Sequence, residues 1–237
     1  MFISIEGNIG SGKTTLAKAL AKQLKATYLP EQFEENALLP LFYNDRKTFA
    51  FPTEYSFLID RHKQLHTYFQ TINKQQVTVS DFHFDKCICF AKANLTKKDY
   101  QYFKKHFKAL QASIMQPNLV VYIHTDVPLL VKNIKKRGRA IEKKIATDYL
   151  SSLKKSLDNY YLVKGKSSSP VLVLTIDAYS DKTLQICCTN CICSIVKETV
   201  DFGFVFIFNI NLLKCMHISS IFCAIKSHNI FLTFWFV

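Results

Sequence analysis

Short apolar runs alternate along the chain with longer segments whose apolar positions recur every three or four residues. The short runs have the length and composition of buried strands, and the longer segments have the periodicity of amphipathic helices. The strand-like runs are residues 1–6, 26–29, 76–81, 119–124 and 171–177. The helix-like segments are residues 15–24, 53–73, 84–94, 97–115, 126–137 and 145–163, and residues 42–52 are predicted to be irregular. This alternation predicts an α/β fold with a five-stranded, parallel, doubly wound sheet and helices on both of its faces.

The segment Gly7-Asn8-Ile9-Gly10-Ser11-Gly12-Lys13-Thr14 fits the phosphate-loop pattern G-x-x-x-x-G-K-[ST] at every fixed position. A strand-like run precedes it, and helix formers from Thr15 onward follow it, which is the setting that the motif requires. Lys13 can neutralise the β- and γ-phosphates, and the Thr14 hydroxyl can bind Mg²⁺. A chance glycine-rich turn is the alternative. The match and both flanks favour a nucleoside triphosphate such as ATP on Gly7 to Thr15, in a three-layer fold of the P-loop NTPase type.

Acidic residues follow two of the predicted strands. Glu31 comes after residues 26–29, and Asp81 ends residues 76–81. Ligands of open α/β sheets bind at the carboxyl ends of the strands, so both carboxylates are expected near the phosphate loop. Glu31 can take a proton from a hydroxyl acceptor, although it can equally cap or solvate its own loop. Asp81 is expected to hold Mg²⁺.

Two further groups of polar residues have a functional and a plain structural interpretation. Glu54 and Arg61 are seven residues apart on one side of the predicted helix 53–73, where they can read a substrate base or form a surface ion pair. Arg137 and Arg139 flank a glycine after a helix, which suits a mobile lid that closes over a triphosphate. A basic surface loop is the alternative for the two arginines.

Composition and charge narrow the class of protein. The formal net charge of +13 permits binding of nucleic acid. Because no basic stripe is interleaved with aromatic residues, a site for phosphate-bearing small molecules explains the charge better. Cys87 and Cys89 lie in an apolar stretch and are expected to be reduced core residues. The phosphate loop starts at residue 7, which leaves no room for a signal peptide, so we expect a cytoplasmic protein.

The last part of the chain, residues 179–237, differs from the rest in being rich in Cys, Phe and Ile and poor in charge. Cys187, Cys188, Cys191 and Cys193 form a possible zinc half-site, but no second half has convincing spacing. Residues 218–237 are long enough for a tail anchor but contain Lys, His and Asn. We favour a third interpretation, in which residues 179–237 are an unstructured or frameshifted tail and residues 1–178 form the domain.

The motifs of residues 1–178 resemble the deoxynucleoside kinase family, especially its bacterial members. Ile5-Glu6-Gly7-Asn8-Ile9-Gly10-Ser11-Gly12-Lys13-Thr14-Thr15 is similar to the family's opening motif, and Pro30-Glu31 is similar to its glutamate after the second strand. Phe42-Tyr43, Glu54 with Arg61, and Arg137-Gly138-Arg139-x-x-Glu142 resemble three further family motifs.

The resemblance implies a role for each matching residue in ATP- and Mg²⁺-dependent phosphorylation of the 5′-hydroxyl of a deoxynucleoside. Glu31 would act on the sugar 5′-hydroxyl, with Lys13, Arg137 and Arg139 on the phosphates. Tyr43 and Glu142 would contact the 3′-hydroxyl, while Glu54 and Arg61 would lie beside the base. Family members are typically homodimers, which implies pairing here through helices 53–73 and 97–115.

The sequence departs from the family at two positions. Family members commonly have an arginine after the acid at position 81, but Phe82 stands there. Glu54 replaces a glutamine, and an ionised carboxylate only accepts hydrogen bonds, which favours adenine, guanine or cytosine as the base. Two alternative functions remain, namely a kinase for nucleotide monophosphates on the same fold and a catalytically weakened nucleotide-binding protein anchored by its tail.

Overall fold

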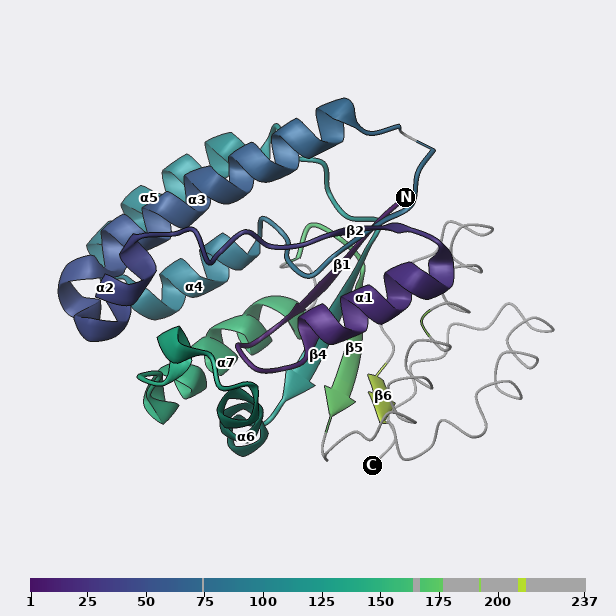
Figure 1. The fold of residues 1–237 in the computed structure, drawn as a ribbon. Helices are drawn as coiled ribbons and strands as arrows, with labels where there is room; N and C mark the ends of the chain where they lie inside the picture. Colours follow the sequence, from purple (N-terminus) through teal and green to yellow (C-terminus); the bar gives the residue numbers. More distant parts are fainter. Residues whose placement is uncertain (74, 164–166, 177–191, 193–208, 212–237) are drawn as a thin grey trace.

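The computed structural model describes residues 1–73, 75–163, 167–176, 192 and 209–211. These residues form one parallel sheet with the strand order β2-β3-β1-β4-β5-β6 (Figure 1). The strands are β1 (Phe2–Gly7), β2 (Thr27–Leu29), β3 (Thr78–Ser80), β4 (Leu119–Thr125), β5 (Val171–Ile176) and β6 (Asn209–Asn211). The five predicted strands are all present. The short strand β6 comes from the predicted tail and pairs with β5, so this piece of residues 179–237 extends the sheet.

The helices cover both faces of the sheet. They are α1 (Lys13–Leu24), α2 (Leu38–Asn44), α3 (Arg46–Thr71), α4 (Lys86–Asn94), α5 (Lys97–Gln111), α6 (Val127–Arg137) and α7 (Thr147–Tyr161), with a 3-10 turn η1 (Ala140–Glu142). Figure 1 shows α3 and α5 as a long pair running side by side, away from α1.

Alternate residues of the central strands point to opposite faces and build two cores. Ile3 and Ile5 of β1 pack with Leu20 of α1, and Ile192 belongs to the same cluster. Phe2 and the β4 residue Tyr122 face the other side, where the cluster includes buried residues of α3, α4, α5 and α7. The sheet is therefore the middle of three layers, as predicted.

The prediction of an irregular segment at residues 42–52 is wrong. α2 occupies its first part, and α3 begins at Arg46 and continues through Pro52. The Asp45 carboxylate accepts a hydrogen bond from the Thr48 N–H at 3.1 Å and so caps α3. Phe42 and residues of the first turns of α3 pack against α7, and this burial outweighs the cost of a proline inside the helix.

The strand register brings three predicted site segments to one edge of the sheet. Leu29 of β2 pairs with Ser80 of β3, and β3 also pairs with β1. Glu31 and Asp81 therefore leave adjacent strands next to the phosphate loop, which leaves β1 after Gly7. The fold positions both carboxylates where their sequence pattern predicts them.

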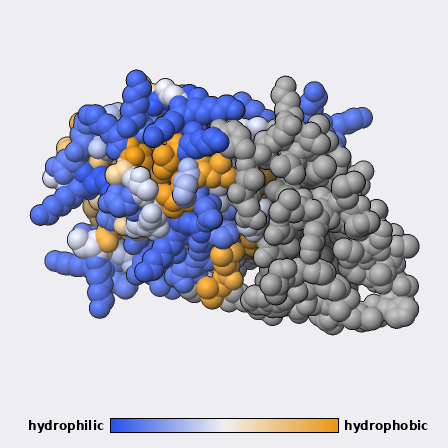
Figure 2. Space-filling view, turned by 90° about the horizontal axis from the view of Figure 1, so that it is seen from below, coloured by the Kyte–Doolittle hydropathy of each residue, from blue (hydrophilic) through white to orange (hydrophobic). Residues whose placement is uncertain are grey.

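The described residues on the face shown in Figure 2 are largely hydrophilic, with hydrophobic residues gathered in limited areas. Among the described residues, no helix has the length and hydropathy needed to span a membrane. The interpretations of Cys187, Cys188, Cys191 and Cys193 as zinc ligands and of residues 218–237 as an anchor lie outside the described residues.

Candidate active site

The phosphate loop makes tight turns between β1 and α1. Gly10 and Gly12 adopt left-handed φ angles of +83° and +93°, and Gly12 is the N-cap of α1. A Cβ on Gly10 would lie 2.9 Å from the carbonyl oxygen of Leu130, so no side chain fits between the loop and α6. The Lys13 ammonium donates to the carbonyl oxygen of Asn8 at 2.9 Å, across the loop. A glycine cradle with one lysine and a helix N-terminus is suited to binding phosphate.

Two asparagines fasten this loop to distant helices. The Asn8 amide donates to the carbonyl oxygen of Leu150 in α7 at 2.9 Å. The Asn133 amide of α6 donates to the carbonyl oxygen of Gly10 at 2.8 Å. The first bond ties the Asn8 side chain to α7, and the second ties the Gly10 main chain to α6. Together they fix the path of the loop.

Lys13 shares its surroundings with charges of both signs. Burial, followed by repulsion from the Lys86 ammonium, lowers the pKa of Lys13 to about 8, although Glu6 opposes the shift. Burial raises the pKa of Glu6 to about 7 against the attraction of Lys86 and Lys13. A phosphate group bound here would relieve the repulsion between the two lysines.

Asp81 connects the phosphate loop with the Glu31 segment. Its carboxylate accepts hydrogen bonds from the Thr14 hydroxyl at 2.6 Å and the Tyr28 hydroxyl at 2.8 Å. Its second oxygen accepts the main-chain N–H of Glu31 at 2.9 Å. Thr14 and Asp81 thus bring together the hard oxygen atoms that Mg²⁺ prefers. Among the described residues, no group of three or more His, Cys, Asp or Glu side chains is placed to hold a metal ion.

The Glu31 carboxylate lies in a nearly buried pair of salt bridges. Arg61 contacts Oε1 through Nε at 2.9 Å and through a terminal nitrogen at 2.7 Å. The Lys86 ammonium contacts Oε2 at 2.5 Å. Burial alone would raise the pKa of Glu31, but Lys86 and Arg61 outweigh burial and hold that pKa at about 2. Glu31 is therefore ionised at neutral pH, and the alternative of a residue that only solvates its loop does not fit this geometry.

Sequence reasoning missed Lys86. Phe82, which stands where the family's arginine is expected, is fully buried in the hydrophobic core and supplies no charge to the site. Lys86, in the first turn of α4, supplies a cation instead and is 5% exposed. The available signal was a single lysine at the start of the apolar run Cys87–Ala91, five residues after Asp81.

Glu54 and Arg61 are both buried and pair with other groups, so the structure excludes the alternative of a surface ion pair between them. The Asn94 amide of α4 donates to Oε1 of Glu54 at 2.6 Å, whereas Oε2 is buried without a partner among the described residues. Burial raises the pKa of Glu54 to about 7, against the Asn94 hydrogen bond and the more distant charges of Arg61 and Lys86. Asn94 is a second residue that the sequence did not reveal.

The predicted lid follows α6 and carries two arginines that meet on one buried carboxylate. Arg137 contacts Glu142 through Nε at 3.0 Å and through a terminal nitrogen at 2.6 Å. Arg139 lies 3.6 Å from Glu142 and 3.5 Å from Glu34, which follows β2. Tyr43 lines the same cavity as Glu142, and burial first and the Glu142 charge second raise the pKa of its phenol. These contacts favour a lid over a plain surface loop.

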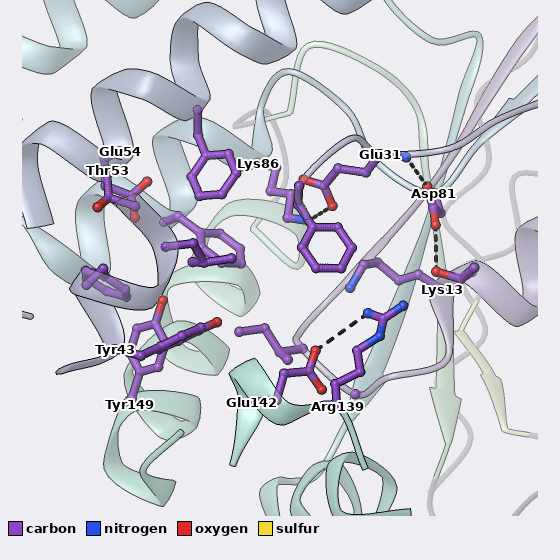
Figure 3. A pocket seen from close by; sticks show the side chains of 18 of the residues that line it. Lys13, Glu31, Tyr43, Thr53, Glu54, Asp81, Lys86, Arg139, Glu142 and Tyr149 are labelled. Atoms are coloured by element: carbon purple, nitrogen blue, oxygen red, sulfur yellow. Dashed lines mark hydrogen bonds and ion pairs between the residues drawn. The ribbon is translucent and has the colours of Figure 1, made fainter. Parts of the chain in front are cut away.

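All these segments line one cavity of about 730 Å³ (Figure 3). Lys13, Asp81 and Arg139 lie toward one end, and Thr53, Glu54 and Tyr149 toward the other. Glu31 and Lys86 lie between the two ends. The cavity can therefore hold a phosphate donor at one end and an aromatic acceptor at the other.

A glycine cradle, a hydroxyl–aspartate pair and converging cations define a phosphate-loop phosphotransferase. The sequence matches the model of the family described as "Deoxynucleoside kinase" over residues 3–201. It is 36% identical over 180 residues to deoxyguanosine kinase of Bacillus subtilis (strain 168), which covers 76% of this chain and 87% of that protein. Deoxyadenosine/deoxycytidine kinase of the same strain is 27% identical over 188 residues, 75% of this chain and 83% of the relative.

The fold comparison gives the same result. The structure of deoxyadenosine kinase from M. mycoides with bound dCTP has a TM-score of 0.70 and 25% sequence identity, covering 84% of this chain and all of that chain. The chain belongs to the deoxynucleoside kinase family and phosphorylates deoxynucleosides. The family match extends beyond residue 178 to residue 201.

Proposed function

We propose that this kinase transfers the γ-phosphoryl group of ATP to the 5′-hydroxyl of a deoxynucleoside, with Glu31 as the acceptor of the hydroxyl proton. The observation that carries the proposal is that Glu31 and the phosphate-loop residue Lys13 line the same cavity. Lys13, Arg137 and Arg139 stabilise the charge that spreads over the phosphoryl oxygens. The 5′-oxygen forms a bond to the γ-phosphorus as the bond from that phosphorus to the bridging oxygen breaks.

The low pKa of Glu31 determines when the proton moves. A carboxylate with a pKa of about 2 is a weak base, so its first contribution is to orient the hydroxyl oxygen toward the donor. The proton passes to Glu31 as bond formation makes the hydroxyl acidic.

Thr14 and Asp81 would hold Mg²⁺ beside the triphosphate. When bound, the ion supplies positive charge that polarises the phosphoryl oxygens. The contribution of this chain is to keep the hydroxyl and the carboxylate adjacent, because Asp81 is also fastened by Tyr28 and by the Glu31 N–H.

Two residues that line the cavity would recognise the sugar. Tyr43 and Glu142 would each contact its 3′-hydroxyl. Glu142 can accept a hydrogen bond from that hydroxyl while Arg137 remains paired with it, since a carboxylate has about four lone-pair sites. Substrate binding would thereby be coupled to the position of the lid arginines.

The base selected by this site is guanine. The ionised Glu54 carboxylate is an acceptor only, and guanine presents two neighbouring donors, N1–H and the 2-amino group, on its Watson–Crick edge. Adenine and cytosine each present one donor beside a ring-nitrogen acceptor, which would face the lone pairs of Glu54. The buried, unpartnered Oε2 of Glu54 supports this choice, as does the similarity to a deoxyguanosine kinase.

A nucleoside-panel assay tests the proposal. Purified full-length protein with ATP and Mg²⁺ should phosphorylate deoxyguanosine in preference to the other three deoxynucleosides. Glu31→Gln and Lys13→Ala should each lower kcat by about 100-fold or more, because each removes a group that acts in the transition state. Glu35→Gln is the control, since Glu35 is exposed on the same loop. Near-normal rates for Glu31→Gln would disprove the assigned role, and ATP binding without phosphorylation of any nucleoside would favour the weakened-protein alternative.

We also propose a cytoplasmic homodimer that pairs through α3 and α5. Both helices carry large exposed apolar side chains, namely Ile59 on α3 and Tyr102 on α5, which are 44% and 54% exposed. Burial of such groups stabilises an interface. Light scattering should give twice the mass of the chain, and a monomer at micromolar concentration would contradict this assembly.

A further inference from the structure

Both oxygens of the Glu31 carboxylate already accept hydrogen bonds from cations. Arg61 donates twice to Oε1, and the Lys86 ammonium contacts Oε2. The two bonds from Arg61 use both lone pairs of Oε1, so an incoming hydroxyl has to donate to Oε2. It competes there with the Lys86 ammonium.

Arg61 is firmly held in its position. Its guanidinium lies 4.5 Å from the centre of the Phe57 ring, and a further nitrogen lies 3.4 Å from the Cys87 sulfur. Arg61 is 4% exposed, and its planar guanidinium donates two hydrogen bonds to Oε1 of Glu31. Moving it would break all of these contacts together.

Lys86 is held by fewer contacts. Besides contacting Oε2 of Glu31, its ammonium lies 5.3 Å from the centre of the Phe90 ring. An ammonium on a flexible four-carbon stem can redirect its hydrogen bonds with little rearrangement of the main chain. Lys86 is thus the partner of Glu31 that can move.

The destination for the Lys86 ammonium is the phosphate end of the cavity. Lys86 and Lys13 line the same cavity, and Figure 3 shows Lys86 at the Glu31 carboxylate with the Lys13 amino group directed toward the same space. Burial first and repulsion from the Lys86 ammonium second lower the pKa of Lys13. An anionic phosphoryl group between them would attract both.

We propose that Lys86 is a catalytic residue whose ammonium leaves Oε2 of Glu31 when the deoxynucleoside hydroxyl arrives and pairs with the phosphoryl group in transfer. Oε2 then accepts the hydroxyl proton, the 5′-oxygen bonds to the γ-phosphorus, and the bridging oxygen leaves with its electron pair on the nucleoside diphosphate. Lys86 keeps its own protons throughout and supplies charge. This inference rests on the proposed role of Glu31.

The exchange of partners explains how the site does without a cation at position 82. Phe82 belongs to the core, so the positive charge comes from Lys86, the first residue of α4. Lys86 also balances Glu31 before the acceptor binds, which avoids leaving a buried carboxylate with only one cationic partner.

The test compares Lys86→Met, Lys86→Arg and Lys92→Met in the full-length protein with ATP, Mg²⁺ and deoxyguanosine. Lys92 is the matched control, because it is an exposed lysine on the same helix. We expect kcat of Lys86→Met to fall by about 100-fold or more, while KM for both substrates changes by less than about fivefold, because the attraction between the ammonium and the phosphoryl group strengthens as charge builds up in the transition state. Lys86→Arg should recover at least about tenfold of the lost kcat.

A second measurement uses the wild-type protein, so it does not depend on whether a variant folds. A crystal structure with deoxyguanosine and a non-hydrolysable ATP analogue should show the Lys86 ammonium within hydrogen-bonding distance of the γ-phosphate and displaced from Oε2. An ammonium still on Oε2 in that complex would overturn the inference. So would a Lys86→Met kcat within threefold of Lys92→Met, or a loss confined to KM. If Glu31→Gln is also fully active, the proposed function itself fails; if Glu31→Gln is inactive, only the role of Lys86 fails.

Discussion

Replacing Glu54 by Gln tests how the site chooses its base. Glu54 is 3% exposed, and its Oε2 has no partner among the described residues. The substitution keeps the size of the side chain and the oxygen that can accept from Asn94, but it exchanges the second acceptor for an NH₂ donor. That donor would face the donor edge of guanine, so one hydrogen bond is lost and two donors oppose each other.

The expected fall in kcat/KM for deoxyguanosine follows from the loss of a hydrogen bond to a charged acceptor. A hydrogen bond to a charged group contributes about 1.5–3 kcal/mol when its partner would otherwise be left buried and unpaired. This corresponds to about a 10- to 150-fold fall in kcat/KM for deoxyguanosine. Deoxyadenosine presents a donor beside an acceptor and therefore matches an amide, so its kcat/KM should rise or stay constant.

The pH dependence of the base preference gives a second test of the role of Glu54. The pKa of Glu54 is about 7 in the protein without substrate, and guanine pairs with the ionised form. The protonated form presents a donor beside an acceptor and thus pairs with adenine. Between pH 6 and pH 8 the ionised fraction rises from about one tenth to about nine tenths. The kcat/KM ratio of deoxyguanosine to deoxyadenosine should therefore rise with pH across this range and become flat in Glu54→Gln.

The assay is a coupled measurement of ADP release with each deoxynucleoside at three or more pH values. Taking the ratio of two substrates on the same enzyme cancels the titration of groups that serve both, such as Lys13 and Glu6. Glu35→Gln is the control and should keep the wild-type ratio. A wild-type preference for deoxyguanosine that survives unchanged in Glu54→Gln, or a ratio that does not vary with pH, would refute the reasoning about this carboxylate.

Three other perturbations have definite expected outcomes. Gly10→Ala would force a Cβ to within 2.9 Å of Leu130 O at a left-handed φ, so ATP affinity measured by calorimetry should fall at least about tenfold; unchanged affinity would contradict the cradle geometry. Arg137→Met should lower kcat about 100-fold with a smaller change in ATP affinity, and a kcat near wild type would exclude Arg137 from the transition state. A chain that ends near residue 195 should remain folded and active by circular dichroism and kinase assay; an unfolded or inactive product would show that residues 196–237 belong to the domain.

The layered fold could be predicted because its signals are local. Each of the five strands is a continuous apolar run, and the phosphate loop is a motif with a fixed spacing. The carboxyl-end rule then placed Glu31 and Asp81 correctly, because in a parallel sheet the end of every strand lies at the same edge.

Pairings across the fold could not be predicted in the same way. Glu31 is 30 positions from Arg61 and 55 positions from Lys86, and no periodicity connects them. The partner of Glu54, Asn94, comes from another helix for the same reason. The roles of these residues in the reaction remain predictions, whereas their positions are features of the fold.

Local preference also gave one wrong result. Pro52 and the aromatic residues before it indicated an irregular segment, yet α3 runs through them. Burial of the first turns of α3 against α7 decided the structure, and a window of a few residues does not contain that information.

The hydrogen bond from Asn8 to Leu150 has a consequence for the newly synthesised chain. The glycine segment is synthesised before its anchor, which lies 142 positions later in the chain. A fragment that ends before α7 contains the whole phosphate-loop motif but lacks the hydrogen bond that fixes the path of the loop. We therefore expect the loop of a growing chain to reach its final shape only after α7 has been synthesised.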